Sequence, residues 1–263
     1  MPKASRDAVT GDVRKNNMPL SITNWNINRA TPSSPQAERL KTYFDGFAPD
    51  IIILTETHDE FIPIEGYFGI HSGTPDYSHA EGERMCSIWS KVPVDPLNDY
   101  MSDPARCTAG RIILTENHAI VVCAIVLPWV GDAWQGHPSR DGNAFQKALD
   151  TYRVDWRKLR AQFPNDDFIL AGDFNQDLIA DHYYGSKDQK RILREAFRKD
   201  DLKPLTADTN DPVYRDSPPH ACIDHICISE PSGFILDSIV RWPDTPAPDL
   251  AFSDHFAITA KLI

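Results

Sequence analysis

Polar side chains that suit metal and phosphate chemistry recur in five short segments of the sequence. The segments are WNIN (residues 25–28), LTETH (54–58), GDFN (172–175), IDHICIS (223–229) and SDH (253–255). Their carboxylates, carboxamides and imidazoles suit a hard divalent cation such as Mg²⁺ or Mn²⁺, which prefers oxygen ligands and keeps water for exchange with substrate. Zinc would suit the set less well. The chemistry indicated is a cation that neutralises carboxylates so that an anionic substrate can approach.

Two of these segments end stretches with strand character. Residues 20–28 alternate as a β-strand does, which predicts that Asn26 and Asn28 point to the same face. Residues 50–56 are apolar until their end, as expected of a strand covered on both faces, and Glu56 stands where that strand emerges. Both segments predict polar side chains at one end of a sheet.

The other segments predict how the sheet is built. Asp173 follows a strand over residues 168–171, whereas Asp224 and Asp254 stand at the starts of strands. Side chains at opposite strand ends meet at one edge only when neighbouring strands are antiparallel, so we expect a mixed sheet. The same alternation sends His225 away from the face used by Asp224, which favours a structural histidine there.

Strand and helix patterns alternate along the chain and indicate an α/β protein. A helix should begin at Ser34-Pro35 and end near Gly46, with further amphipathic helices over residues 145–163 and 187–199. The basic residues of 187–199 should form a solvated helix face. The remaining strands are predicted at residues 86–90, 111–115, 118–127, 223–229, 234–240 and 256–263. Polar loops that are candidates for substrate contact span residues 66–84, 129–143 and 242–252.

The composition argues against several classes of protein. The 263 residues carry 38 Asp+Glu against 27 Lys+Arg, a formal net charge of -11, which opposes nucleic-acid binding by bulk positive charge. The longest apolar stretch, residues 119–130, is too short for a transmembrane helix, which needs roughly 20 residues. Residues 1–19 lack the apolar core of a secretory signal. We therefore expect a cytoplasmic protein, with residues 1–19 a disordered lead-in and residues 20–263 a single domain.

In this order, the five segments resemble the motifs of the endonuclease/exonuclease/phosphatase superfamily, which includes AP endonucleases, DNase I, sphingomyelinases and inositol-phosphate phosphatases. The resemblance extends over residues 20–263. It implies a four-layer α/β sandwich, in which two mixed β-sheets pack face to face and are flanked by helices. It also implies a catalytic domain that hydrolyses phosphate esters with Mg²⁺ or Mn²⁺.

The resemblance further implies which residues bind the metal. Glu56 resembles the family's principal metal ligand, with Asn28 and Asp254 as supporting ligands. Asn28 departs from the Asp found there in AP endonucleases, and a carboxamide removes one negative charge from the site. We expect this change to affect the metal affinity or the number of metal ions bound.

Five other residues resemble the family's reacting groups. Asp173 matches the residue that orients or deprotonates the attacking water, and Asn175 the one that contacts the phosphate. His255, paired with Asp224, resembles the His–Asp couple that donates to a phosphoryl oxygen as charge builds. Asn26 matches the residue that steadies Asp173.

One group that the family usually presents is missing. After the strand that precedes Leu127, family members usually have a His or Tyr, but this chain continues Leu-Pro-Trp. Either metal-bound water protonates the leaving oxygen, or His137 or Arg140 reaches the site from the following loop. Arg111 is a candidate phosphate contact, and Trp129 is a candidate for stacking on a base or a lipid headgroup.

Hydrolysis of a phosphodiester is the predicted reaction, and a nuclease acting on DNA or RNA is the first hypothesis. One alternative is a phosphodiesterase or phosphatase acting on a lipid headgroup or a small phosphate ester. Another is a binding module that has lost catalysis, suggested by Asn28 and by the missing His or Tyr. No obligate protein partner is implied. The net negative charge opposes tight, charge-driven binding, so the substrate is less well defined than the reaction.

Overall fold

Twelve strands form two six-stranded sheets in the computed structural model, which describes residues 19–77 and 79–263. The first sheet has the spatial order β11 (Leu236–Trp242), β12 (Ala257–Leu262), β1 (Leu20–Asn26), β2 (Ile51–His58), β4 (Glu83–Ser90) and β3 (Phe68–His71). The second has the order β5 (Val94–Pro96), β6 (Cys107–Thr115), β7 (His118–Val126), β8 (Asp167–Asp173), β10 (Asp224–Ser229) and β9 (Leu202–Pro204). The α-helices are α1 (Pro35–Phe47), α2 (Asn143–Gln162), α3 (Lys187–Lys199) and α4 (Pro212–Asp216). Of the predicted lead-in, residues 1–18 lie outside the described residues.

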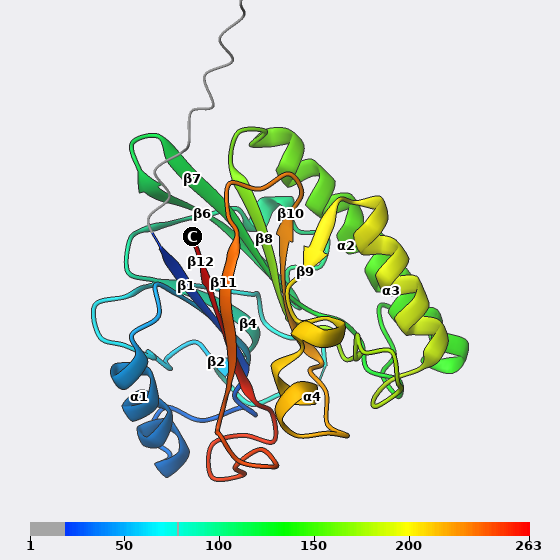
Figure 1. The fold of residues 1–263 in the computed structure, drawn as a ribbon, viewed down its shortest axis with the longest axis horizontal. Coiled ribbons are helices and arrows are strands. Elements are labelled where there is room, and N and C mark those ends of the chain that lie inside the picture. Colours follow the sequence, from blue (N-terminus) through cyan, green and yellow to red (C-terminus); the bar gives the residue numbers. More distant parts are fainter. Residues whose placement is uncertain (1–18, 78) are drawn as a thin grey trace, which may run out of the picture.

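The two sheets pack face to face, and helices cover their outer faces, which gives four layers (Figure 1). Between the sheets lies an aliphatic core that includes Ile22 and Ile53 from one sheet and Val122 and Ile226 from the other. A separate apolar cluster joins α1 to the first sheet, and a third joins α2 and α3 to the second. The prediction of a four-layer α/β sandwich is confirmed.

Both sheets are mixed, as the positions of the polar segments predicted. β1 runs parallel to β2 and antiparallel to β12. β8 runs parallel to β7 and antiparallel to β10, so Asp173, the last residue of β8, lies directly opposite Asp224, the first residue of β10. In each sheet, two carboxyl ends and one amino end of neighbouring strands therefore meet at the same edge.

Local sequence explains where the main helices begin. The Ser34 hydroxyl accepts a hydrogen bond from the N–H of Ala37, and Pro35 takes the first helical position, where its missing N–H costs nothing. Ser186 caps α3 in the same way. The predicted bounds of α3 are confirmed, and α1 ends one residue beyond the predicted Gly46. Across the described ranges, no helix combines the length and apolarity needed to cross a bilayer.

The elements that sequence patterns missed are the short ones. β3, β5, β9 and α4 have 4, 3, 3 and 5 residues. Such lengths are too short for a two-residue or 3.6-residue period to become visible. The three strands are held by pairing with longer strands. The helix α4 is capped by the side chain of Asp211.

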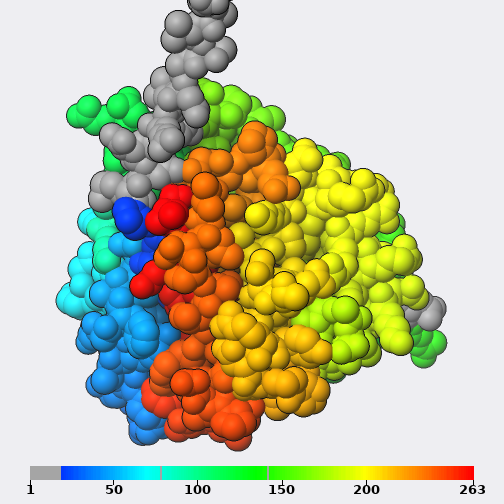
Figure 2. Space-filling view, viewed as in Figure 1, coloured from blue at the N-terminus to red at the C-terminus, as the bar shows by residue number. Residues whose placement is uncertain are grey.

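The loop over residues 243–252 lies against both α1 and the end of α4. Arg39 of α1 donates from Nε to the carbonyl oxygen of Ala251 at 3.0 Å. Ser217, directly after α4, donates from Oγ to the carbonyl oxygen of Thr245 at 3.4 Å. Figure 2 shows this orange-red loop between the blue surface of α1 and the gold surface around α4. The loop is thereby fixed next to the strand ends that carry the polar segments.

His71, the last residue of β3, is expected to make folding stability depend on pH. Burial lowers the pKa of His71 from 6.5 to about 4, and its Nδ1 atom is buried without a hydrogen-bond partner among the described residues. Below pH 6.5 the unfolded chain binds a proton that the folded chain resists. The free energy of unfolding should therefore fall by about 2–3 kcal/mol as the pH drops from 6.5 to about 4.

Urea unfolding at several pH values measures this effect. The matched variant is His71→Phe, which keeps an aromatic ring beside Trp89 and should flatten the profile over this range. An identical slope in both proteins would assign the pH dependence to other groups.

Candidate active site

A cavity of about 640 Å³ opens at the edge where the two sheets bring these strand ends together. Its lining includes Glu56 from β2, Asp173 from β8, Asp224 from β10 and His255 from the turn before β12. The three loops predicted to contact substrate contribute Tyr77, Trp129 and Pro248. Polar segments far apart in the sequence therefore face one common space.

Asn26 connects two carboxylates from different sheets. Its Nδ2 donates hydrogen bonds to Glu56 Oε1 and to Asp173 Oδ2, each at 3.2 Å. Its Oδ1 accepts a hydrogen bond from the N–H of Asn28 at 2.9 Å. The side chain is 1% exposed, so these bonds are sheltered from water. Asn26 thereby holds Glu56 and Asp173 in a fixed relation.

The backbone after Asn26 corrects one prediction. β1 ends at Asn26, and Asn28 and Arg29 both have positive φ (48° and 54°), so strand alternation stops before Asn28. Asn28 is exposed and does not line the cavity. Arg29 does line it, with its guanidinium 3.2 Å from Glu56 Oε2. Asn26 and Asn28 do not share a face, because the chain turns between them.

The GDFN segment depends on a glycine. Gly172 has a φ of +140°, and a Cβ there would lie 1.9 Å from the carbonyl oxygen of Ile125 in β7. This close approach delivers Asp173 to the cavity, where its Oδ1 accepts from the N–H of Asn175 at 2.8 Å. The Asn175 Nδ2 donates to the carbonyl oxygen of Leu127 at 2.9 Å. The Oδ1 atom of Asn175 is left for the cavity that this residue lines.

Asp224 and His255 form an ion pair across the two sheets. His255 Nδ1 lies 2.6 Å from Asp224 Oδ2, and the two side chains are 16% and 5% exposed. Burial alone would lower the pKa of His255, but Asp224 outweighs burial and raises it to about 10. The imidazole is therefore charged at neutral pH, and its Nε2–H can donate into the cavity.

The pKa of Asp173, by contrast, is shifted in the direction that favours the neutral carboxyl group. Burial raises the pKa of Asp173 to about 7, and the charge of Asp224, directly opposite in the strand ladder, adds to this shift. A carboxyl group with a pKa near the working pH can accept and release a proton, as a general base must.

Ser253 fixes the turn that carries His255. Its hydroxyl donates to the carbonyl oxygen of Asn26 at 2.6 Å and accepts from the N–H of His255 at 3.0 Å. Trp25 Nε1 donates to the carbonyl oxygen of His255 at 3.0 Å. Hydrogen bonds to backbone carbonyl oxygens therefore connect the WNIN and SDH segments.

The lining suits a divalent cation. Asp173, Asp224 and His255 each offer one ligand atom, and these atoms lie within 4.8 Å of one another. Glu56 and the exposed Asp254 add two more carboxylates. Asp224 Oδ1 is buried without a hydrogen-bond partner in the described part of the chain. A bound cation is one way to compensate such an oxygen.

Arg111 does not reach the cavity. Its Nε and NH2 atoms lie 2.6 and 3.3 Å from the carboxylate of Asp166, which directly precedes β8. Because Asp173 is at the other end of β8, Arg111 lies at the opposite edge of the sheet. The expectation of a phosphate contact fails because this cation is bound to a carboxylate far from the site.

The loop after β7 carries three predicted substrate contacts, and one of them lines the cavity. Trp129 lines the cavity, with 53% of its surface exposed. His137 stacks on Trp134, with ring centroids 5.9 Å apart, and Arg140 is exposed in a short 3-10 helix. Neither His137 nor Arg140 lines the cavity, because the loop folds back on itself.

The lining also holds residues that the sequence reasoning missed. Arg29 follows WNIN directly, so its place in the motif was an available signal. Arg106 is 5% exposed and lies 2.7 Å from Asp132, and Tyr184 comes from the loop between β8 and α3. Arg106 and Tyr184 stand in irregular segments, where no periodic pattern marks the direction of a side chain.

Comparisons with known proteins place this architecture in a family. The sequence profile described as the Endonuclease/Exonuclease/phosphatase family matches residues 23–255. The chain belongs to this family of hydrolase-type enzymes, as its motifs indicated. A search of curated proteins found no significant match.

Solved structures of other proteins share the fold. The catalytic domain of Xenopus laevis APE2 has a TM-score of 0.61 at 18% identity, covering 92% of this chain and 91% of that chain. The 3'-5' exonuclease from Neisseria meningitidis has a TM-score of 0.59 at 18% identity, with coverages of 92% and 98%. D. rerio TDP2, complexed with a single-strand DNA product, has a TM-score of 0.60 at 13% identity, with coverages of 94% and 100%.

Proposed function

We propose that this protein is a Mg²⁺- or Mn²⁺-dependent phosphodiester hydrolase, and specifically a nuclease acting on DNA or RNA. One observation carries the proposal: a carboxyl group that can accept a proton and a charged imidazole that can donate one face the same cavity. Burial raises the pKa of Asp173 to about 7, whereas Asp224 raises the pKa of His255 to about 10. A base beside a cationic donor suits attack of water on a phosphate.

Each group then has a defined task. Asp173 takes a proton from the attacking water, and Asn175 helps to position that water and the phosphate. His255 Nε2 donates to a phosphoryl oxygen as negative charge builds there, while Asp224 keeps the imidazole charged and oriented. Asn26 keeps Asp173 in place.

Glu56 is the residue that we expect to hold the divalent cation, with Asp254 as a further oxygen donor in the same lining. When bound, the cation would neutralise phosphoryl charge. Asn28 does not receive this role, because its exposed side chain does not line the cavity. The carboxylate oxygens are the hard donors that Mg²⁺ and Mn²⁺ prefer.

Two lines support nucleic acid as the substrate. The structural relatives include an AP endonuclease, an exonuclease and a protein bound to a single-strand DNA product. The lining also combines the cations Arg29 and Arg106 with the aromatic ring of Trp129. Cations suit a phosphate backbone and aromatic rings suit bases.

The proposal is tested by assaying plasmid, single-stranded DNA, RNA and a chromogenic diester, with and without Mg²⁺ or Mn²⁺. We expect cleavage of at least one nucleic acid. Cleavage of the small diester alone would replace the nuclease with a small-ester phosphodiesterase. An inert protein, indistinguishable from Asp173→Asn on every substrate, would contradict the enzyme itself.

Removal of the metal is expected to abolish most of the activity. EDTA should lower the rate at least tenfold, and either Mn²⁺ or Mg²⁺ should restore it. Glu56→Gln keeps the hydrogen bond from Asn26 but removes the charge, so it should need about tenfold more metal for half-maximal rate. Metal titration of the rate measures this, with Glu65→Gln as the control on an exposed carboxylate. Equal metal requirements in all three proteins would rule out Glu56 as the ligand.

A further inference from the structure

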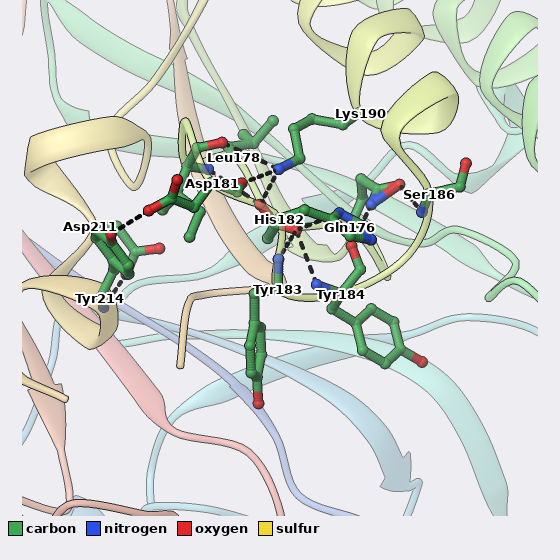
Figure 3. Close-up of polar contacts among 12 residues, drawn as sticks. Gln176, Leu178, Asp181, His182, Tyr183, Tyr184, Ser186, Lys190, Asp211 and Tyr214 are labelled. Carbon is green, nitrogen blue, oxygen red and sulfur yellow. Dashed lines mark hydrogen bonds and ion pairs between the residues drawn. The ribbon is translucent and has the colours of Figure 1, made fainter. Parts of the chain in front are cut away.

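We propose that Tyr184 is a catalytic residue, whose phenol donates a hydrogen bond to a phosphate oxygen of the bound substrate. The proposal rests on the function proposed above. Leu127, directly after β7, lines the cavity without a polar side chain, so this strand end supplies no side-chain donor to the cavity. The loop between β8 and α3 supplies one. In Figure 3 the rings of Tyr183 and Tyr184 extend from one side of this loop, away from Lys190.

Tyr184 differs from Tyr77, which also lines the cavity. Its phenol has no hydrogen-bond partner among the described residues. Tyr184 lines the same cavity as Asp173 and Asp254. Burial raises its pKa, and the charges of these two carboxylates raise it further. By contrast, the Tyr77 hydroxyl donates to Met85 Sδ at 2.8 Å. Tyr184 therefore combines a free donor with a position beside the reacting groups.

A buried ion pair fixes the backbone that carries Tyr184. Asp177 is 0% exposed, and its Oδ2 accepts from the N–H groups of Tyr183 and Tyr184 at 3.1 and 2.9 Å. Its Oδ1 lies 2.5 Å from Lys190 Nζ, which also donates to the carbonyl oxygen of Ile179 at 3.1 Å. Lys190 was expected on a solvated helix face, but it turns inward. The ion pair thereby joins this loop to α3.

Gln176 fixes the same loop from its other side. Its Nε2 donates to the carbonyl oxygen of Tyr184 at 2.6 Å, and its Oε1 accepts from the N–H of Ser186 at 3.1 Å. Its own carbonyl oxygen accepts from His225 Nε2 at 2.8 Å. Gly185, at a φ of +80°, has no room for a side chain, since a Cβ would lie 2.0 Å from Gln176 Nε2. The loop therefore presents Tyr184 from a scaffold built of buried polar contacts, as a substrate-binding group requires.

The test compares Tyr184→Phe with Tyr183→Phe, the same change one residue earlier on the loop. Tyr183 is 40% exposed, and burial alone raises its pKa. Tyr184→Phe should lower kcat/KM on a chromogenic diester about 10- to 100-fold, the range for losing a hydrogen bond to a charged group. Tyr183→Phe should stay within about twofold of wild type. Wild-type rates in both variants, or equal losses in both, would overturn the proposal.

Binding of inorganic phosphate, measured by calorimetry, separates this proposal from the proposed function. Tyr184→Phe should weaken phosphate binding about tenfold, and Tyr183→Phe should not change it. If the wild-type protein hydrolyses nothing, the proposed function fails, and phosphate binding alone decides whether Tyr184 contacts the anion. If the wild-type protein is active but Tyr184→Phe matches it in both measurements, only the role of Tyr184 fails.

Asp177 acts here as a positioning residue, and a double-variant cycle tests that role. Asp177→Asn should lower kcat/KM, and Asp177→Asn combined with Tyr184→Phe should be no slower than Tyr184→Phe alone. A double variant that is much slower would mean that Asp177 affects the reaction independently of Tyr184, which would contradict its assignment to Tyr184. Should Asp177→Asn not fold, the comparison of the two tyrosine variants still decides the proposal.

Discussion

The Asp173→Asn protein is expected to hydrolyse phosphodiesters at least about a thousandfold more slowly than wild type, because a carboxamide cannot take the proton of the attacking water. Its fold should persist, since asparagine has the same shape. Burial raises the pKa of Asp173 to about 7, so ionising this carboxylate in the folded protein is unfavourable. The neutral side chain removes this cost, but its amide nitrogen cannot accept one of the two hydrogen bonds that Asp173 accepts from Asn26 and Asn175. These opposing effects should keep the Tm within about 5 °C of wild type.

Rates at saturating metal and thermal melting of the same samples measure both halves of this prediction. Asp237→Asn, on an exposed position of β11, is the control and should keep its rate within about twofold. If Asp173→Asn keeps a tenth of the wild-type rate, another group activates the water. If it melts well below wild type, the loss of activity reflects the fold rather than the base.

Loss of the His255–Asp224 pair is expected to have the second largest effect. His255→Ala and Asp224→Asn should each lower kcat/KM about 100- to 1000-fold, the size of a lost oxyanion donor. The double variant should be little slower than His255→Ala, because Asp224 acts by keeping His255 charged and oriented across a 2.6 Å contact.

A kinetic cycle of the two single variants and the double variant measures this coupling. Added imidazole provides an independent check, since it should partly restore His255→Ala and not Asp224→Asn. Single effects that multiply in the double variant would mean that the two residues work separately.

The position of the site could be predicted because side chains at the ends of neighbouring strands lie at the same edge of the sheet. Asp173 and Asp224 are terminal residues of their strands, and Glu56 lies two residues before the end of β2. A mixed sheet leaves one edge where such strand ends meet. All of them line one cavity. Their chemical roles stay predictions.

Other features could not be predicted, because they depend on tertiary contacts. Asn28 leaves its expected face because two consecutive residues turn with positive φ. Arg111 is bound by Asp166, fifty-five positions away, and no local pattern indicates such a partner. Lys190 looks like an ordinary solvated helix residue until the loop carrying Asp177 packs beneath it. Sequence periodicity describes regular elements, whereas these residues depend on where irregular segments meet.

Because the cavity lies where two sheets meet, the site is complete only after both sheets have formed. β5 to β10 form the second sheet from one continuous stretch of chain, and they already contain Asp173 and Asp224. His255 arrives only with β12, which inserts between β11 and β1. During synthesis, a chain that has not yet delivered β12 holds the base without its cationic partner. With the proposed roles, we therefore expect the nascent chain to lack phosphodiesterase activity until β12 pairs with β1 and β11.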